Sequence, residues 1–150
     1  MNKKRTILRF AAVTLLAITL PTTNCLLAQD KSAAAQEQSP LAKSLLGTWI
    51  LVGEPGKVAE APAAGGRLKF FTGRHWMITQ ADPDTGVTVY HHGGTYTLNG
   101  DDYAETIEYA NENTKALIKQ TLKFTIKVEG DTLTQIGVGN SFNEVWKRVK

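Results

Sequence analysis

The chain has 150 residues, of which 17 are basic and 14 are acidic, giving a formal net charge of +3. Four of the basic residues and none of the acidic ones lie in the first 28 residues, so 13 basic and 14 acidic side chains follow. A balance this close to neutral excludes neither enzymes nor binding proteins, but it argues against nucleic acid or an anionic membrane surface as partner. Subtracting 28 from 150 leaves 122 residues, enough for one domain with a core and too few for two.

The first 28 residues have the pattern of a secretory signal peptide. A basic start precedes the apolar run 10–20, which is too short to span a bilayer, and Ala28 offers a small residue at the cleavage site. We therefore expect a secreted or periplasmic protein, and no later segment is apolar for long enough to span a membrane. Cys25 leaves open a lipid-modified cysteine, but Asn24 before it matches that processing signal poorly, so lipoprotein anchoring is the less favoured alternative.

The remaining chain divides into a predicted flexible tether, residues 29–44, and a predicted domain, residues 45–150. The tether is rich in Ala, Gln, Lys and Ser. The domain consists of short segments in which apolar and polar residues alternate, most clearly from Leu122 to Val128, and this period of two is typical of strands. The predicted strands are 45–53, 67–71, 75–80, 87–92, 94–98, 103–110, 122–128, 132–138 and 141–149.

Short turns join these segments. Asn99-Gly100 is the strongest hairpin signal, because both residues tolerate positive φ. The segments on either side of Gly93-Gly94 form two short strands or one strand broken at the glycines. A short helix is predicted at 115–119, before the 122–128 strand, with Asn113 as its cap. Eight or nine strands with connections this short favour an all-β fold, an antiparallel up-and-down β-barrel.

Two short motifs resemble those of a known family. Gly47-Thr48-Trp49 on the first strand is similar to the Gly-x-Trp signature of lipocalins, and Trp146-Lys147-Arg148 is similar to the site of the basic residue that crosses this Trp. Further segments, 93–98, 105–109, 125–133 and 144–148, resemble the lipocalin-like domains of secreted bacterial proteins, calycin-type barrels mostly of unknown function. The resemblance covers roughly residues 45–150 and implies barrel closure by Gly47, Trp49 and Arg148, with binding of a small hydrophobic ligand.

The alternation also places polar residues among aromatic ones on the inward faces. The predicted inward aromatics are Trp49, Phe70, Trp76, Tyr96, Phe124 and Trp146, and the polar residues predicted to share their faces are Gln80, Tyr103, Glu105, Tyr109, Glu144 and Arg148. A buried glutamate needs a partner, and Arg148 is the predicted partner of Glu105. The predicted ligand-binding residues are Trp76, Gln80, Tyr96, Tyr103, Glu105, Tyr109, Phe124, Trp146 and Arg148.

These features favour a monomer that binds a small amphipathic molecule in its interior, without catalysis and without a cofactor. One alternative is an enzyme that uses the same cavity, with Glu105 or His75 as acid–base. Another is a structural or protein-interaction barrel with a filled core. No metal is expected, because His91 and His92 are adjacent and point to opposite faces of an extended strand.

Overall fold

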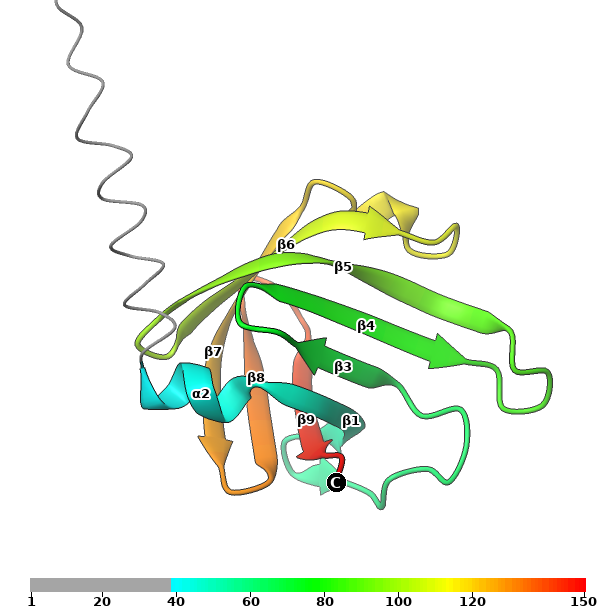
Figure 1. Cartoon of the computed structure of the whole chain (residues 1–150), viewed down its shortest axis with the longest axis horizontal. Helices are drawn as coiled ribbons and strands as arrows, with labels where there is room; N and C mark the ends of the chain where they lie inside the picture. Colours follow the sequence, from blue (N-terminus) through cyan, green and yellow to red (C-terminus); the bar gives the residue numbers. More distant parts are fainter. Residues whose placement is uncertain (1–38) are drawn as a thin grey trace, which may run out of the picture.

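The computed structural model describes residues 39–150. The predicted signal peptide with its cleavage site at Ala28, Cys25 and most of the predicted tether lie outside the described residues. In chain order, the elements are helix α2 (Pro40–Leu45), strands β1 (Gly47–Glu54), β2 (Lys57–Val58), β3 (Leu68–Phe71), β4 (His75–Ala81), β5 (Thr88–Asn99) and β6 (Asp102–Ala110), the 3₁₀ turn η1 (Lys115–Leu117), and strands β7 (Thr121–Glu129), β8 (Thr132–Val138) and β9 (Asn143–Arg148) (Figure 1).

The strands form one antiparallel sheet that closes on itself. Its order is β2-β1-β3-β4-β5-β6-β7-β8-β9, and β1 also pairs with β9. Eight strands therefore make a closed barrel, with β2 as a short addition outside it, and the predicted all-β up-and-down barrel is confirmed. In the described part of the chain, no helix has the length and apolar character needed to cross a membrane.

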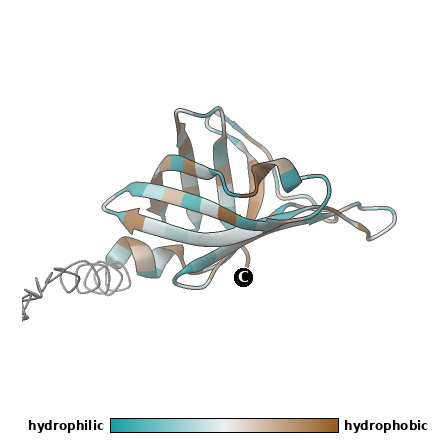
Figure 2. Cartoon of the chain, turned by 90° about the horizontal axis from the view of Figure 1, so that it is seen from above, coloured by the Kyte–Doolittle hydropathy of each residue, from teal (hydrophilic) through white to brown (hydrophobic). Residues whose placement is uncertain are grey.

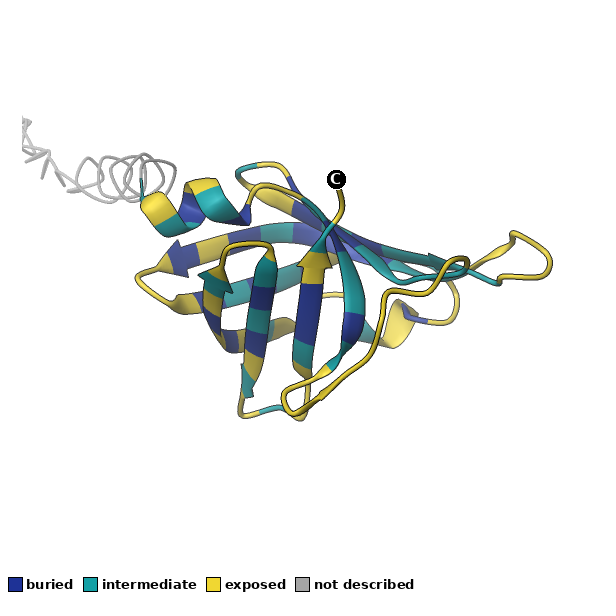
Figure 3. Cartoon of the chain, turned by 90° about the horizontal axis from the view of Figure 1, so that it is seen from below, coloured by how far each residue is buried: buried dark blue, intermediate teal, exposed yellow. Residues whose placement is uncertain are grey.

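Alternation along each strand builds the core. On β7, Phe124 and Ile126 are buried while Lys123, Thr125 and Lys127 are exposed, as the sequence predicts. Bands of opposite hydropathy and opposite burial follow one another along the strands (Figures 2 and 3). Closing the sheet gathers the buried bands into one interior cluster, in which each large apolar side chain contributes about 1.5–3 kcal/mol.

Strand β5 passes through both glycines without a break, so the first alternative, two separate strands, is wrong. On the neighbouring strand β6, Tyr109 pairs with Gly93 and Ile107 pairs with Gly94, which leaves Glu108 between them as an extra residue without a partner in β5. Such a bulge reverses the faces of the residues beyond it. Tyr109, predicted to face inward, is therefore on the outer face and 42% exposed.

Helix α2 occupies the end of the segment predicted to be a flexible tether. Ser39 accepts a hydrogen bond from the backbone N–H of Ala42 at 3.0 Å, and Pro40 stands in the first turn, so the helix has a favourable start. A helix this short is unstable alone, and burial of Ala42 and Leu45 against the barrel core stabilises it. The tether prediction therefore extended too far along the chain.

The predicted helix at 115–119 is only a three-residue 3₁₀ turn, η1, and Asn113 does not cap it. The Asn113 side chain instead donates a hydrogen bond to the carbonyl oxygen of Val89 at 2.7 Å. This contact ties the segment before η1 to strand β5.

Candidate functional site

A buried ion pair lies in the barrel interior. Lys69 of β3 and Glu105 of β6 form it, and their side chains are 1% and 4% exposed. Lys69 also donates to Oε1 of Gln135 at 3.0 Å, and the Tyr103 hydroxyl donates to Oε1 of Glu105 at 2.8 Å. Glu105 thus faces the interior, but the prediction that Arg148 is its partner is wrong.

Lys69 was missed because the predicted inward face of β3 is the wrong one. Phe70 was predicted to face inward, whereas Lys69 and Phe71 are buried and Phe70 is half-buried. The pairing of Phe71 with Trp76 of β4 sets this register. In a four-residue strand with the sequence Leu-Lys-Phe-Phe, local pattern alone assigns the charged residue to solvent.

Aromatic rings surround the Lys69 ammonium. Its Nζ lies 5.1–6.0 Å from the centroids of the rings of Phe71, Trp76, Tyr103, Phe124 and Trp146. Cation–π attraction at these distances offsets part of the cost of removing the ammonium from water. Four of the predicted ligand-binding aromatics, Trp76, Tyr103, Phe124 and Trp146, therefore do surround a polar centre, but that centre is a lysine of the chain itself.

Burial controls the ionisation of this centre. It raises the pKa of Glu105, while the charge of Lys69 and the hydrogen bonds from Lys69 and Tyr103 act to lower it. Burial, followed by the Glu105 charge, raises the pKa of Tyr103 well above its ordinary value. The phenol therefore stays protonated and remains a donor, and the carboxylate depends on Lys69 for its charge.

A small cavity adjoins the ion pair. Its volume is about 20 Å³, and it is lined by Lys69, Ile78, Tyr90, His92, Glu105, Leu117, Leu122, Phe124, Phe142 and Glu144. A cavity of this size holds about one water molecule. This cavity therefore has no room for a ligand of more than a few atoms.

His92 forms part of the cavity wall as a neutral imidazole. Burial, followed by the charges of Lys69 and Arg67, lowers its pKa from 6.5 to about 4. Its ring packs edge-on against Trp76 at 5.3 Å and Tyr90 at 5.0 Å. Its Nδ1 is buried and has no hydrogen-bond partner among residues 39–150. The cavity wall therefore includes a residue with a buried, unpartnered nitrogen.

A larger hollow at the barrel rim lies next to this cavity; we call it the rim hollow. Its volume is about 310 Å³, and it is lined by Leu51, Gly53, Glu54, Arg67, Ser141, Phe142, Asn143 and Glu144. Phe142 and Glu144 line both spaces, so the hollow and the cavity are neighbours that share part of one wall. Glu144 accepts a hydrogen bond from the indole N–H of Trp146 at 3.2 Å. Gln80, another predicted site residue, accepts from Nε of Arg67 at 3.0 Å.

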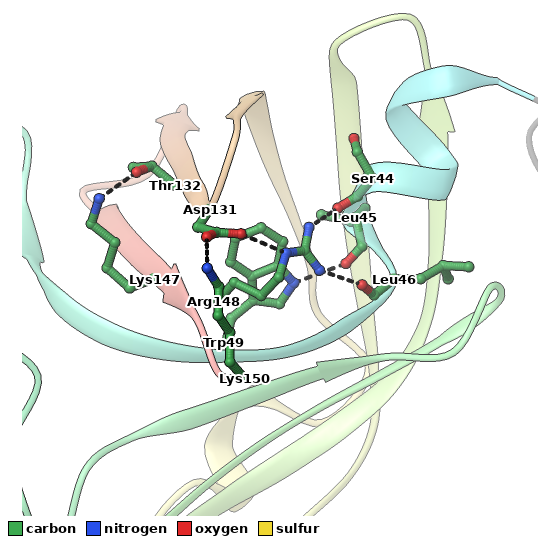
Figure 4. Close-up of polar contacts among 9 residues, drawn as sticks. All are labelled: Ser44, Leu45, Leu46, Trp49, Asp131, Thr132, Lys147, Arg148 and Lys150. Carbon is green, nitrogen blue, oxygen red and sulfur yellow. Dashed lines mark hydrogen bonds and ion pairs between the residues drawn. The ribbon is translucent and has the colours of Figure 1, made fainter.

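Arg148 lies at the end of the barrel that α2 covers. Its guanidinium carbon is 4.1 Å from the centroid of the Trp49 ring, and it donates to the carbonyl oxygens of Ser44 and Leu46 at 2.5 and 2.8 Å (Figure 4). A Cβ on Gly47, whose φ is +117°, would lie 3.2 Å from Nη1 of Arg148. The three residues named for barrel closure therefore come together, and Arg148 belongs to this closure rather than to the interior polar centre.

Two other hollows lie along the barrel. One, of about 330 Å³, is lined by Thr97, Asn99, Asp102, Tyr103, Ala104, Lys123, Phe124 and Val138. The other, of about 230 Å³, is lined by Ala42, Leu46, Gly73 and Tyr96. Tyr96, a predicted ligand-binding residue, is therefore buried beside α2, away from the rim hollow's lining.

The residues named for the enzyme alternative are differently placed. His75 is exposed at the start of β4, whereas Glu105 is buried and bound by Lys69 and Tyr103. Within residues 39–150, no three His, Cys, Asp or Glu side chains are grouped so that they would hold a metal ion.

Comparisons with known proteins place the fold. No family model and no curated protein matches the chain. A lipocalin-like protein from Bacteroides uniformis matches with a TM-score of 0.53 and 12% identity, over 71% of this chain and 99% of that one. An uncharacterized protein from Bacteroides eggerthii matches with a TM-score of 0.50 and 14% identity, over 70% of this chain and 99% of that one. Identities this low show the fold alone, and that fold is a lipocalin-like barrel.

Proposed function

We propose that this barrel binds a small amphipathic molecule along the path from the rim hollow to the interior ion pair, as a monomer and without catalysis. The observation that carries the proposal is that the two spaces are neighbours, since Phe142 and Glu144 line both. Apolar walls with a few convergent polar groups are the usual composition of small-molecule sites.

The buried ion pair supports a polar inner end for this site. Replacing a buried ion pair by apolar residues of similar volume is often neutral or stabilising, so packing alone gives no reason for Lys69 and Glu105 to be charged. A polar atom of a ligand that entered the cavity would meet these charges and the unpartnered Nδ1 of His92.

The volumes divide the ligand between the two spaces. The cavity of about 20 Å³ takes a polar atom or a water molecule, while the hollow of about 310 Å³ takes the larger part of the molecule. Phe142 is 40% exposed in the connection between β8 and β9, so its side chain has room to turn toward solvent. Deeper entry requires that turn.

A filled structural barrel is the second candidate function. The same cavity volume of about 20 Å³ favours it, as does the apolar surface on the outer face of β8, where Ile136 is 38% and Val138 52% exposed. Such a barrel would engage another protein through its outer surface and bind no small molecule inside.

Titration with N-phenyl-1-naphthylamine, an apolar dye whose emission rises out of water, separates the two candidates. The test variant is Ser141→Trp, which adds bulk to the lining of the rim hollow, and the control is Thr125→Trp on the exposed face of β7. We expect saturable 1:1 binding to the wild type and to the control, and at least tenfold weaker binding to the test variant. Equal binding to both variants, or no saturable binding to the wild type, overturns the proposal.

We also propose that the protein is exported, on the basis of the basic start and apolar run in its first 28 residues. N-terminal sequencing of the mature protein from its host is then expected to begin near Gln29. A mature chain that begins with a lipid-modified Cys25 would show the alternative processing.

A further inference from the structure

Two opposite charges face the rim hollow without neutralising each other. Arg67 and Glu144 both line it, and neither forms an ion pair with any residue in the described range 39–150. Elsewhere the structure pairs its buried charges, as Lys69 and Glu105 illustrate. The rim hollow therefore holds one cationic and one anionic group that remain available to a ligand.

The Arg67 side chain is held in position. Its guanidinium carbon lies 4.0 Å from the centroid of the Tyr90 ring, and its Nε donates to Gln80 at 3.0 Å. Its terminal nitrogens have no hydrogen-bond acceptor within the described residues. A guanidinium fixed through its Nε and one face presents the remaining N–H groups as a fork, the geometry that matches a carboxylate.

The Glu144 carboxylate is half-buried and also held. One oxygen accepts the indole N–H of Trp146 at 3.2 Å, which leaves acceptor capacity on the other oxygen. The pKa of the Tyr90 hydroxyl is raised, mainly by burial. The charge of Arg67 acts to lower this pKa and the charge of Glu144 acts to raise it. Both charges therefore lie within electrostatic reach of the same ring.

We propose that the rim hollow takes a zwitterion with an apolar substituent, whose carboxylate binds Arg67 and whose ammonium binds Glu144. This inference rests on the proposed function and names the ligand class for it. A head group with a single charge would pair with one of the two residues and meet a like charge at the other. Leu51 and Phe142 supply the apolar wall for the substituent. Glu54 also lines the hollow, but it is exposed, so solvent screens its charge.

Three probes with one skeleton test this ligand class by calorimetric titration. L-phenylalanine is zwitterionic, 2-phenylethylamine lacks the carboxylate, and 3-phenylpropanoate lacks the ammonium. We expect the wild type to bind phenylalanine at least tenfold more tightly than either singly charged probe. Glu144→Gln is expected to lose about tenfold for phenylalanine and 2-phenylethylamine and nothing for 3-phenylpropanoate. Arg67→Gln is expected to lose about tenfold for phenylalanine and 3-phenylpropanoate only.

Two controls accompany these variants. Glu54→Gln removes an exposed carboxylate from the same hollow and is expected to change each affinity by less than twofold. Arg67→Lys keeps the charge and is expected to keep the wild-type order of probes, which separates loss of charge from loss of folding. Unfolding midpoints of all variants check that the barrel is intact.

The outcomes separate the inference from the function beneath it. If Ser141→Trp blocks the dye while the three phenyl probes bind with equal affinity, the zwitterion inference is wrong and the proposed function stands. The same conclusion follows if Glu144→Gln and Arg67→Gln weaken all three probes alike. If neither the dye nor any phenyl probe binds the wild type, the proposed function fails and the inference fails with it.

Discussion

Removing the charge of Lys69 is the most informative perturbation of the barrel interior. In Lys69→Met, the Glu105 carboxylate loses its ion pair and keeps only the hydrogen bond from the Tyr103 hydroxyl, at 2.8 Å. The pKa of Glu105 is already raised by burial, and loss of the lysine charge raises it further. The variant must therefore hold a buried charge without its partner or take up a proton.

Uptake of a proton by Glu105 sets the expected loss of stability. From an ordinary pKa of 4.5, protonating a carboxyl at pH 7 costs about 3.4 kcal/mol, within the range of about 3–5 kcal/mol for breaking buried ion pairs. Between pH 4.5 and the raised pKa, the folded variant binds one proton more than the unfolded chain, so its stability falls as pH rises. The stability of the variant is therefore expected to rise by about 1.4 kcal/mol per pH unit of acidification across this interval.

Urea denaturation followed by tryptophan fluorescence at pH 5, 6 and 7 measures the free energy of unfolding of the wild type and the variants. The double variant Lys69→Met, Glu105→Gln removes both charges and is expected to regain all but about 1 kcal/mol. Lys127→Met breaks the exposed pair with Glu129 and is expected to cost less than about 1 kcal/mol. A Lys69→Met variant whose stability does not rise from pH 7 to pH 5, or a double variant no better than Lys69→Met alone, would refute the reasoning.

Three further predictions concern closure, acid stability and the bulge. Trp49 is fully buried and donates to the carbonyl oxygen of Leu45 at 2.8 Å, so Trp49→Ala is expected to cost about 3–5 kcal/mol in urea denaturation. A loss of stability below about 1 kcal/mol would show that Trp49 is not part of the core. His92 has a pKa of about 4 in the folded barrel and an ordinary pKa of 6.5, so the unfolded chain binds the extra proton between these values and stability falls on acidification. Between pH 6.5 and pH 4, after allowance for solvent screening, the stability of His92→Phe is expected to fall by about 1–2 kcal/mol less than that of the wild type. Equal falls in the two proteins would contradict this. A Cβ on Gly94 would lie 2.1 Å from the carbonyl oxygen of Thr106, so Gly94→Ala is expected to lower the free energy of unfolding by about 1–3 kcal/mol. The control Thr97→Ala, on the exposed face of β5, is expected to lower it by less than about 0.5 kcal/mol. Similar losses in the two variants would contradict the close approach of the two strands at Gly94.

Much of the fold follows from local sequence. The period of two along 122–128 fixes which side of β7 faces inward, and the Asn99-Gly100 signal predicts the hairpin that makes β5 and β6 antiparallel neighbours. The two-residue loop is Gly100-Asp101, since Asn99 ends β5 and pairs with Asp102. Helix α2 was missed because its stability comes from burial of Ala42 and Leu45 against distant strands. A six-residue segment carries little helical signal of its own.

The interior site was predicted only in part, for two physical reasons. The bulge at Glu108 breaks the alternation that Tyr103 and Glu105 obey, so Tyr109 is on the opposite face from the one predicted. The partner of Glu105 is Lys69, 36 positions earlier in the chain, and only barrel closure brings the two together. A pattern rule that assigns every lysine to solvent misses such a pair.

Amide and indole chemical shifts in an NMR titration with N-phenyl-1-naphthylamine test the central claim, binding at the rim hollow and interior cavity, most directly. We predict shifts at the amides of His92, Phe142 and Glu144 and at the indole N–H of Trp146, which is hydrogen-bonded to Glu144. Shifts confined to the hollow beside Ala104 and Val138, or to the hollow between Ala42 and Tyr96, would contradict the claim.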